Sequence, residues 1–314
     1  MLYLAFLLAI FLLPFHRASH SGRVHFLKTL KRVSVGGIAH ASDGKFGDIL
    51  LADVLTSYAK IIADLFVSLC MFFSRDGSAT KRPDRACGGQ YLVPIIIAIP
   101  SLIRFRQCIT EYLRVRDSNR RSGTIGASGW GGQHLANALK YSSAFPVIIF
   151  SALQRNLSAN HDTIGITEIT LYRFWLLAVF TNSFYSFYWD VAKDWDLTLF
   201  SPPSSSSPSS TYPLRSRIYL PSRELYYFAI ITDFLLRMIW SLKLSPHLDH
   251  FADFESGIFI MEALEVGRRW IWIFFRVETE WVRSMGSAVS LGSPRQDDIL
   301  MADYGSGKDS DDEF

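Results

Sequence analysis

Charged residues are scarce in this sequence of 314 residues. They make up 19% of the chain, whereas soluble domains carry about 25%. Apolar residues reach 49% and aromatic residues 14%. This composition excludes an intrinsically disordered chain and a collagen-like repeat, because both contain few bulky apolar residues. The apolar residues must therefore be concentrated in segments that avoid water.

Cysteine is also scarce, with only Cys70, Cys87 and Cys108 in the chain. The three residues lie in or beside apolar segments, and no two of them have the C-x-x-C spacing. We therefore expect neither a zinc site nor a disulfide framework.

The sequence lacks the common catalytic and nucleotide-binding motifs. It contains no P-loop, no G-x-G-x-x-G and no G-x-S-x-G, and its eight histidines fall mostly in loops. No metal-ligand or Ser/His/Asp constellation is evident, so an intramembrane transferase is the weakest interpretation, and we expect no enzyme, cofactor or metal. A net charge of +3 gives no reason to expect a nucleic-acid partner.

Long apolar segments are what the sequence has in abundance. Seven are long enough, or nearly so, to cross a hydrocarbon layer of about 30 Å. They predict an all-α, polytopic membrane helical bundle. The first lacks the basic start and the cleavage site of a signal peptide, so we interpret it as a membrane helix, the remnant of a longer N-terminal region. The seven segments are 1–15, 47–73, 91–108, 133–153, 169–190, 225–243 and 257–276.

The basic residues between these segments are distributed unevenly. With residues 16–46 on the cytosolic side and the sides alternating, the cytosolic stretches hold 20 Lys and Arg residues and the opposite loops hold six. Cytosolic loops of membrane proteins carry such an excess. The distribution therefore predicts a cytosolic C-terminus and places the sequon at Asn156 on the lumenal side.

Two stretches are low in complexity. Residues 201–210, SPPSSSSPSS, read as a flexible insertion in a cytosolic loop. Residues 285–314 end in KDSDDEF and read as a disordered acidic tail. Either a phosphorylation or adaptor segment, or an unselective solvated tail, fits this composition.

Ionisable residues recur at helical spacing inside the apolar segments. Asp233 and Arg237 are four residues apart, and Glu265 precedes Arg268 and Arg269 by three and four residues. A charge in a membrane helix costs several kcal/mol unless it is paired or faces water. Two interpretations remain open: polar faces that line a path for an oxyanion, which arginine forks recognise well, or internal salt bridges that hold the bundle together.

The aromatic residues near the ends of the segments have a simpler interpretation. Tryptophan and tyrosine are enriched where a membrane meets water. We therefore expect the following residues to be anchors at the membrane interface: Trp195, Tyr226, Tyr227, Trp270, Trp272 and Trp281.

Several motifs resemble the EXS domain, the membrane part of eukaryotic phosphate exporters of the plant PHO type and the animal xenotropic-retrovirus-receptor type. The resemblance covers about residues 16–283. The spacings WD-x-x-x-DW and LEV-x-RR-x-W are specific enough to exclude a chance likeness between apolar helices. The motifs are RFRQCITEYLR (104–114), HLANALKYSSAF (134–145), YSFYWDVAKDWDL (185–197), DFLLRMIW (233–240) and ALEVGRRWIWIFFRVETEW (263–281).

Within this family the stretch 46–74 is most similar to the fungal ER-retention-defective branch, which lacks the SPX sensor domain. The resemblance implies residence in the Golgi membrane, with the endoplasmic reticulum as the alternative. It also implies return of lumenal inorganic phosphate to the cytosol, in support of glycosylation and of the retention of resident enzymes.

The resemblance further implies which residues would form the phosphate path. Two neighbouring positions depart from the exporters, since Thr56 replaces an asparagine and Ala59 a serine. The implied path residues are Asp53, Lys140, Tyr141, Asp190, Asp194, Arg237, Trp240, Glu265, Arg268 and Arg269.

A second function competes with transport. The bundle could be a trafficking scaffold whose loops recruit retrieval or coat adaptors, or glycosyltransferases. The basic stretch 104–123 could serve that role, although contact with anionic membrane lipid explains it as well. A homodimer is compatible with either function.

Overall fold

The computed structural model describes residues 20–40, 44–73, 87, 91–123, 129–160, 168–197, 199, 214–215, 218–239 and 255–289. The described residues form helices and no strand, which confirms the all-α prediction. The helices are α2 (His20–Ser34), α3 (Lys45–Ser57), α4 (Ala59–Phe73), α5 (Leu92–Ser122), α6 (Gly132–Ser142), α7 (Ala144–Asn160), α8 (Glu168–Trp189), the π-helix η2 (Asp190–Asp194), α9 (Glu224–Arg237) and α11 (Glu255–Val289).

Six of the seven apolar segments coincide with these helices, and segment 1–15 lies outside the described residues. Two segments are each built as a pair of helices. The segment 47–73 bends by 61° between α3 and α4, and the segment 133–153 is divided between α6 and α7. By length and apolar composition, one described helix, α5, can cross a membrane, and the bent pair of α3 and α4 is a second candidate. The count of seven spans therefore stays a prediction.

Two helices extend beyond the predicted apolar segments. α5 continues past residue 108 and ends at Gly123, whose φ of 67° is the left-handed conformation that commonly terminates a helix. α11 continues to Val289, so the first five residues of the predicted tail are helical, and residues 290–314 lie outside the described part. The predicted loop 16–46 also contains a helix, α2.

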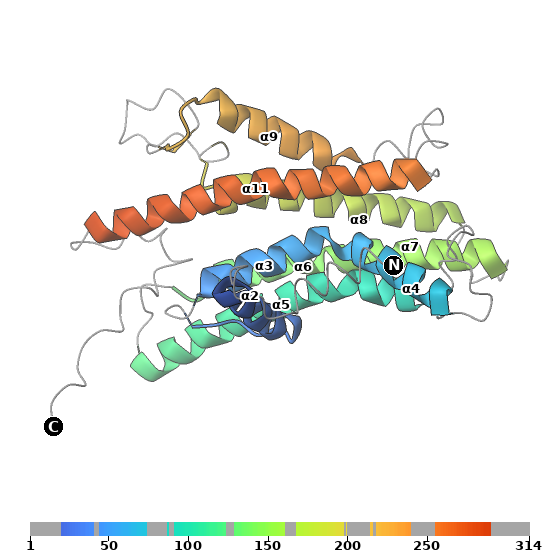
Figure 1. Cartoon of the computed structure of the whole chain (residues 1–314), viewed down its shortest axis with the longest axis horizontal. Helices are drawn as coiled ribbons and strands as arrows, with labels where there is room; N and C mark the ends of the chain where they lie inside the picture. Colours follow the sequence, from blue (N-terminus) through green and yellow to red (C-terminus); the bar gives the residue numbers. More distant parts are fainter. Residues whose placement is uncertain are drawn as a thin grey trace.

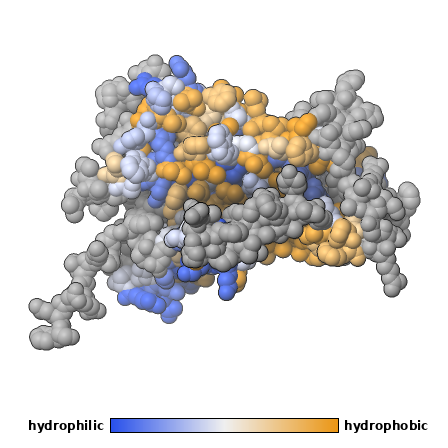
Figure 2. Space-filling view, in the orientation of Figure 1, coloured by the Kyte–Doolittle hydropathy of each residue, from blue (hydrophilic) through white to orange (hydrophobic). Residues whose placement is uncertain are grey.

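The long helices run side by side along the longest axis of the molecule (Figure 1). α5 packs against α6, and α7 against α8, while α11 contacts α3, α9 and η2. Figure 2 shows hydrophilic residues gathered mainly at the end of the bundle where α5 and α11 finish, and hydrophobic residues along most of the remaining visible face. This distribution suits a bundle with its apolar length in lipid.

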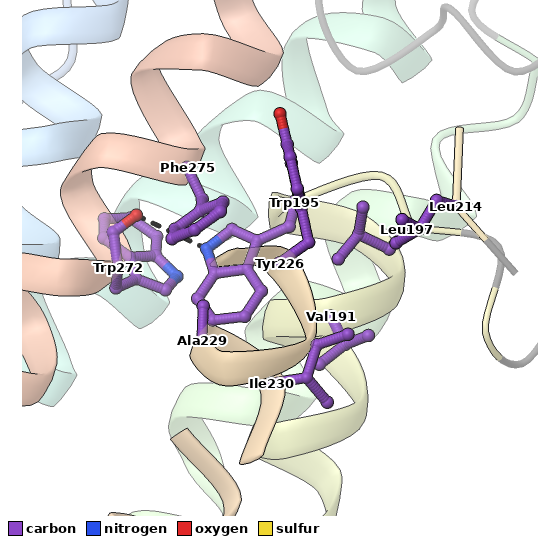
Figure 3. Close-up of a cluster of buried hydrophobic side chains, with 9 residues drawn as sticks. All are labelled: Val191, Trp195, Leu197, Leu214, Tyr226, Ala229, Ile230, Trp272 and Phe275. Carbon is purple, nitrogen blue, oxygen red and sulfur yellow. Dashed lines mark hydrogen bonds between the residues drawn. The ribbon is translucent and has the colours of Figure 1, made fainter. Parts of the chain in front are cut away.

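The largest buried hydrophobic cluster lies where η2, α9 and α11 meet. Its nine residues are Val191, Trp195, Leu197, Leu214, Tyr226, Ala229, Ile230, Trp272 and Phe275 (Figure 3). The indole Nε1 of Trp195 donates a hydrogen bond to the carbonyl oxygen of Trp272 at 3.3 Å. Burying aromatic rings in this way contributes strongly to packing.

This cluster corrects the prediction that the tryptophans and tyrosines are interface anchors. Trp195, Tyr226 and Trp272 are completely or almost completely buried. Trp270 and Trp281 are largely exposed, as the prediction requires. Position relative to the segment ends could not separate the two groups, because burial depends on which side of each helix meets its neighbours.

The prediction of no disulfide was wrong. Cys70, near the end of α4, is bonded to Cys87, 17 residues later. Cys108 is a free, buried thiol. The chain between the two bonded cysteines lets Cys87 return to α4, which the cysteine spacing alone did not indicate.

Candidate functional site

A layer of buried charges crosses the middle of the bundle, and Asp190 lies at its centre. This carboxylate is fully buried. It contacts the ammonium of Lys140 at 3.0 Å, the guanidinium of Arg268 at 3.5 Å and that of Arg237. Helices α6, α9 and α11 thus each send one cation to the same carboxylate. The same cations also pair with Asp194, Asp233 and Glu265, so the layer is a network of matched opposite charges.

The π-helix η2 explains how two carboxylates reach one lysine. Asp190 and Asp194 are its first and last residues, and Lys140 Nζ lies 3.0 Å from the first and 3.3 Å from the second. A π-helix has a wider turn than an α-helix, and such turns occur mainly as short insertions at functional sites. The continuation of α8 as a π-helix therefore turns both carboxylates toward α6.

Arg268 is the most heavily bonded side chain of the layer. It donates to Asp233 at 2.9 Å and to both carboxylate oxygens of Glu265. The predicted pair of Asp233 with Arg237 is also present, at 3.2 Å. Buried guanidiniums with carboxylate partners keep their charge without an unpaired group in an apolar environment.

Glu265 and Arg269, whose spacing of four residues allows an internal salt bridge, form no ion pair with each other within the described residues, and Glu265 pairs with Arg268. Glu265 also accepts a hydrogen bond from Ser57 at 2.7 Å. Arg269 is buried, donates to Ser57 at 2.8 Å and Thr56 at 3.2 Å, and stacks over the ring of Trp272. Thr56, one of the two positions at which this chain differs from the exporters, therefore contacts an arginine of the layer directly. The partners of Arg269 thus come from α3, as Thr56 and Ser57, and not from Glu265 on its own helix.

A second group of charges lies beside this layer, between α3, α5 and α6. Arg104 donates to Asp53 at 2.7 Å, to Gln107 at 2.8 Å and to the hydroxyl of Tyr141 at 3.2 Å. Tyr141 in turn donates to Asp53. All four residues are buried. Arg104 is the first residue of the basic stretch 104–123, which was interpreted as an adaptor-binding or lipid-contacting segment. Its position inside an apolar segment, three residues before Gln107, could have indicated that it is buried.

Two cavities lie on opposite sides of the charge layer. The first, which we call the wide cavity, has a volume of about 340 Å³ and lies toward the start of α11. The second, the narrow cavity, has a volume of about 40 Å³ and lies toward the ends of α5 and α11. The wide cavity is lined by Lys60, Asn182, Ser183, Leu236, Arg237, Ile239, Met261, Glu265 and Arg268.

The structure brings nine of the ten implied path residues into the charge layer or the group beside it. Trp240 lies outside the described residues. Because the chain bends between α3 and α4, Lys60 does not join Asp53 in this group of charges. Lys60 lines the wide cavity. Sequence reasoning did not assign Arg104 and Gln107 to this site, because their contacts form only when residues distant in the sequence meet. Within the described residues, no cluster of His, Cys, Asp and Glu is arranged to hold a metal ion.

An all-helical bundle with apolar flanks and a buried layer of paired charges beside a polar cavity has the features of a polytopic membrane protein. The family model of the EXS family matches residues 1–282. The chain therefore belongs to the EXS family of membrane proteins.

Relatives with known names agree with this assignment. Protein ERD1 homolog 2 of Schizosaccharomyces pombe is 31% identical over 277 residues, which are 87% of this chain and 64% of that protein. Protein ERD1 of Kluyveromyces lactis is 31% identical over 245 residues, 74% of this chain and 58% of that protein. Human solute carrier family 53 member 1 is 30% identical over 282 residues, 85% of this chain and 36% of that protein. The chain thus spans less than two thirds of each.

Proposed function

We propose that the chain conducts inorganic phosphate across the Golgi membrane, from the lumen to the cytosol. The observation that carries the proposal is the charge of the wide cavity. Its lining contains the cations Lys60, Arg237 and Arg268 and a single carboxylate, Glu265. Counted over the lining alone, positive charges outnumber negative ones by two, although Lys60 lies 3.9 Å from Glu262 and the two arginines also pair with Asp190 and Asp233 behind the lining. A small dianion that enters such a cavity can compete with these carboxylates for the cations.

The chemistry of the cations suits phosphate. Arginine presents its N–H groups as a planar fork that matches two oxygens of a tetrahedral anion. Arg237 and Arg268 offer such forks at the cavity. The described hydrogen bonds of Arg269 go to hydroxyl groups of Thr56 and Ser57, so its charge adds to the positive potential behind the cavity.

The carboxylates prevent the layer from becoming a trap. A conducting site must bind its ion strongly enough to admit it and weakly enough to release it. Asp190 and Asp233 share the cations that an incoming phosphate would contact. A phosphate therefore competes with these carboxylates for the arginines and meets a well of moderate depth.

The disulfide supports the proposed orientation of the chain. Cys70 lies near the end of α4, and Cys87 lies in the loop that the distribution of basic residues places in the lumen. Disulfides persist in oxidising compartments and are rare in the cytosol. A lumenal disulfide supports an orientation with the wide cavity toward the lumen and the C-terminus in the cytosol. Protease digestion of sealed Golgi vesicles should remove a tag placed after Phe314, and a protected tag would reverse this orientation.

Phosphate flux in proteoliposomes tests the proposed transport. The purified full chain should release trapped radiolabelled phosphate, and the Arg268→Lys variant should release it much more slowly. Arg120→Gln is the matched control, because Arg120 is an exposed arginine near the end of α5, away from the cavity. Equal flux from liposomes with and without the wild-type protein would exclude transport and favour the trafficking scaffold.

A further inference from the structure

The narrow cavity has no role in the proposed path as described so far. It lies on the opposite side of the charge layer from the wide cavity, and parts of α3, α5, α6, η2 and α11 form its wall. The polar and charged lining residues that matter here are Lys45, Arg104, Glu111, His134, Asn137 and Arg276.

The charges of the narrow cavity differ from those of the wide one. Its lining has three cations and three carboxylates, whereas the wide cavity has three cations and one carboxylate. The narrow cavity is therefore neutral overall when His134 is neutral. An anion that crosses the layer moves from a strongly attractive side to a weakly attractive one, which suits release. The cations of the narrow cavity are Lys45, Arg104 and Arg276, and its carboxylates are Asp53, Glu111 and Asp194.

Arg276 is the least firmly held of these three cations. Arg104 donates to three side chains, and Lys45 is paired with Glu111. Arg276 is equally buried, yet its Nε is 3.9 Å from a carboxylate oxygen of Asp194 and its Nη1 donates one long hydrogen bond of 3.4 Å to the carbonyl of the same residue. A guanidinium has five N–H donors. The guanidinium also lies over the ring of Phe46, 5.7 Å from the ring centroid, but this contact uses none of the donors in hydrogen bonds. Most of the hydrogen-bonding capacity of Arg276 is therefore available to another acceptor.

The cavity also presents an acceptor that suits a protonated oxyanion. The side-chain oxygen of Asn137 is buried and has no hydrogen-bond partner within the described part of the chain. Near neutral pH, inorganic phosphate carries one or two P–OH groups besides its charged oxygens. Asn137 can accept a hydrogen bond from a P–OH group while Arg276 donates to the charged oxygens, so the two residues match both faces of the anion.

We propose that Arg276 is a second phosphate ligand and makes the narrow cavity the release site of the path. This inference rests on the proposed transport of phosphate. A volume of about 40 Å³ holds ordered water but not a phosphate ion beside the present side chains. Occupancy therefore requires a side chain to move, and the pair of Arg276 with Asp194 is the longest ion pair in the lining. Arg276 leaves Asp194, binds the phosphate that has crossed the layer, and returns when the phosphate departs.

Flux and binding measured together test this assignment. In Arg276→Gln proteoliposomes, the maximal flux should fall about tenfold, the size expected when a charge-assisted hydrogen bond is lost. The phosphate concentration at half-maximal flux, added on the wide-cavity side, should stay unchanged because the capture site is intact. Arg276→Lys should restore most of the flux, and Arg120→Gln should match the wild type. Equilibrium binding of radiolabelled phosphate to the detergent-solubilised full chain should persist in Arg276→Gln.

The possible outcomes separate this inference from the proposed function. No flux from the wild-type protein would overturn both. Full flux from Arg276→Gln, with flux lost in Arg268→Lys, would overturn only the release site. A fall in flux accompanied by an equal loss of phosphate binding and of melting temperature in both Arg276 variants would show that Arg276 holds α11 against η2 and is no ligand.

Discussion

The wide and narrow cavities are built from the same kinds of side chain, yet they differ in size and in charge. Both are lined by arginine, lysine and carboxylates from several helices. The wide cavity of about 340 Å³ carries two surplus positive charges, and the narrow cavity of about 40 Å³ carries none. The comparison teaches that the number of carboxylates, more than the number of cations, distinguishes the two sides of the layer.

Burying the charge layer between the cavities costs free energy, which is hard to explain if the layer only stabilises the fold. Buried ion pairs often contribute no more than well-packed apolar residues of the same volume, because both charges lose their hydration. Asp190, Asp233, Arg237 and Arg268 nevertheless form one connected network. The proposed transport gives these charges a role that apolar residues could not supply, since the layer separates the two cavities.

The largest expected effect comes from replacing the guanidinium of Arg268, which lines the wide cavity. Arg268→Lys keeps a positive charge beside Asp233 and Glu265, so the layer stays paired, but the planar fork is lost. We expect phosphate flux in proteoliposomes to fall about 100-fold, as when one partner of a buried charged contact is lost. Arg268→Ala should abolish flux, and the double variant with Arg269→Ala should do so as well. Normal flux in the double variant would exclude the wide cavity as the capture site.

A second expected effect is a change in how tightly the charge layer binds phosphate. Asp190→Asn removes the charge that Lys140, Arg237 and Arg268 share, while the amide preserves the shape of the side chain. Phosphate should then bind about tenfold more tightly and leave more slowly, which is an effect of about 1.4 kcal/mol. Equilibrium binding and flux in the same preparation measure it.

The opposite result for Asp190 would change the interpretation of the layer. If Asp190→Asn weakens binding and slows flux together, the carboxylate positions α9 and α11 and does not compete with the anion. Glu168→Gln at the start of α8 is a suitable comparison, because Glu168 is exposed and lines neither cavity.

The apolar runs predicted the helices well, because the length and hydrophobicity of a helix are local properties. The pair of Asp233 and Arg237 was also predictable, since residues four apart lie on one face of a helix. The group around Arg104 was not, because its partner Asp53 is 51 residues away. The same reason applies to the disulfide, which depends on where the loop returns to α4.

The irregular parts of the helices were beyond local reasoning as well. Asp190 and Asp194, two of the implied path residues, lie at and just after the end of the fifth apolar segment. Nothing in their spacing indicated a π-helix. The bend after Ser57 likewise divides one apolar run into two helices. The resemblance to the exporters therefore named most of the residues that meet in the layer, but it did not show how these irregular helices bring them together.

The disulfide should affect stability without affecting either cavity. Cys70→Ser opens a cross-link between positions 17 residues apart, and a closed loop of this size contributes about 3 kcal/mol through the entropy of the unfolded chain. We expect a melting temperature several degrees lower and an unchanged phosphate affinity. Cys87→Ser should give the same shift, and the double variant should add nothing further. Unequal shifts would show that one cysteine stabilises the fold through packing and not through the bond.

The smallest effect is expected from deleting residues 201–210, which lie outside the described residues and have no part in the proposed path. Their Ser/Pro sequence has no apolar periodicity, and shortening such a loop changes its closure entropy little. The deletion must stop before Arg215, which donates to the carbonyl of Trp195 at 3.0 Å and to Thr279 at 2.7 Å.

Flux after the deletion should stay within about twofold of the wild type, because ten fewer loop residues change the closure free energy by only a fraction of a kcal/mol. Arg215→Ala provides the contrast: it removes the contacts that fasten the chain after the loop to α11 and should lower the melting temperature. A large loss of flux in the deletion, at an unchanged melting temperature, would mean that the Ser/Pro segment regulates release on the side of the narrow cavity. The two sides of the layer would then differ in control as well as in the charges of their linings.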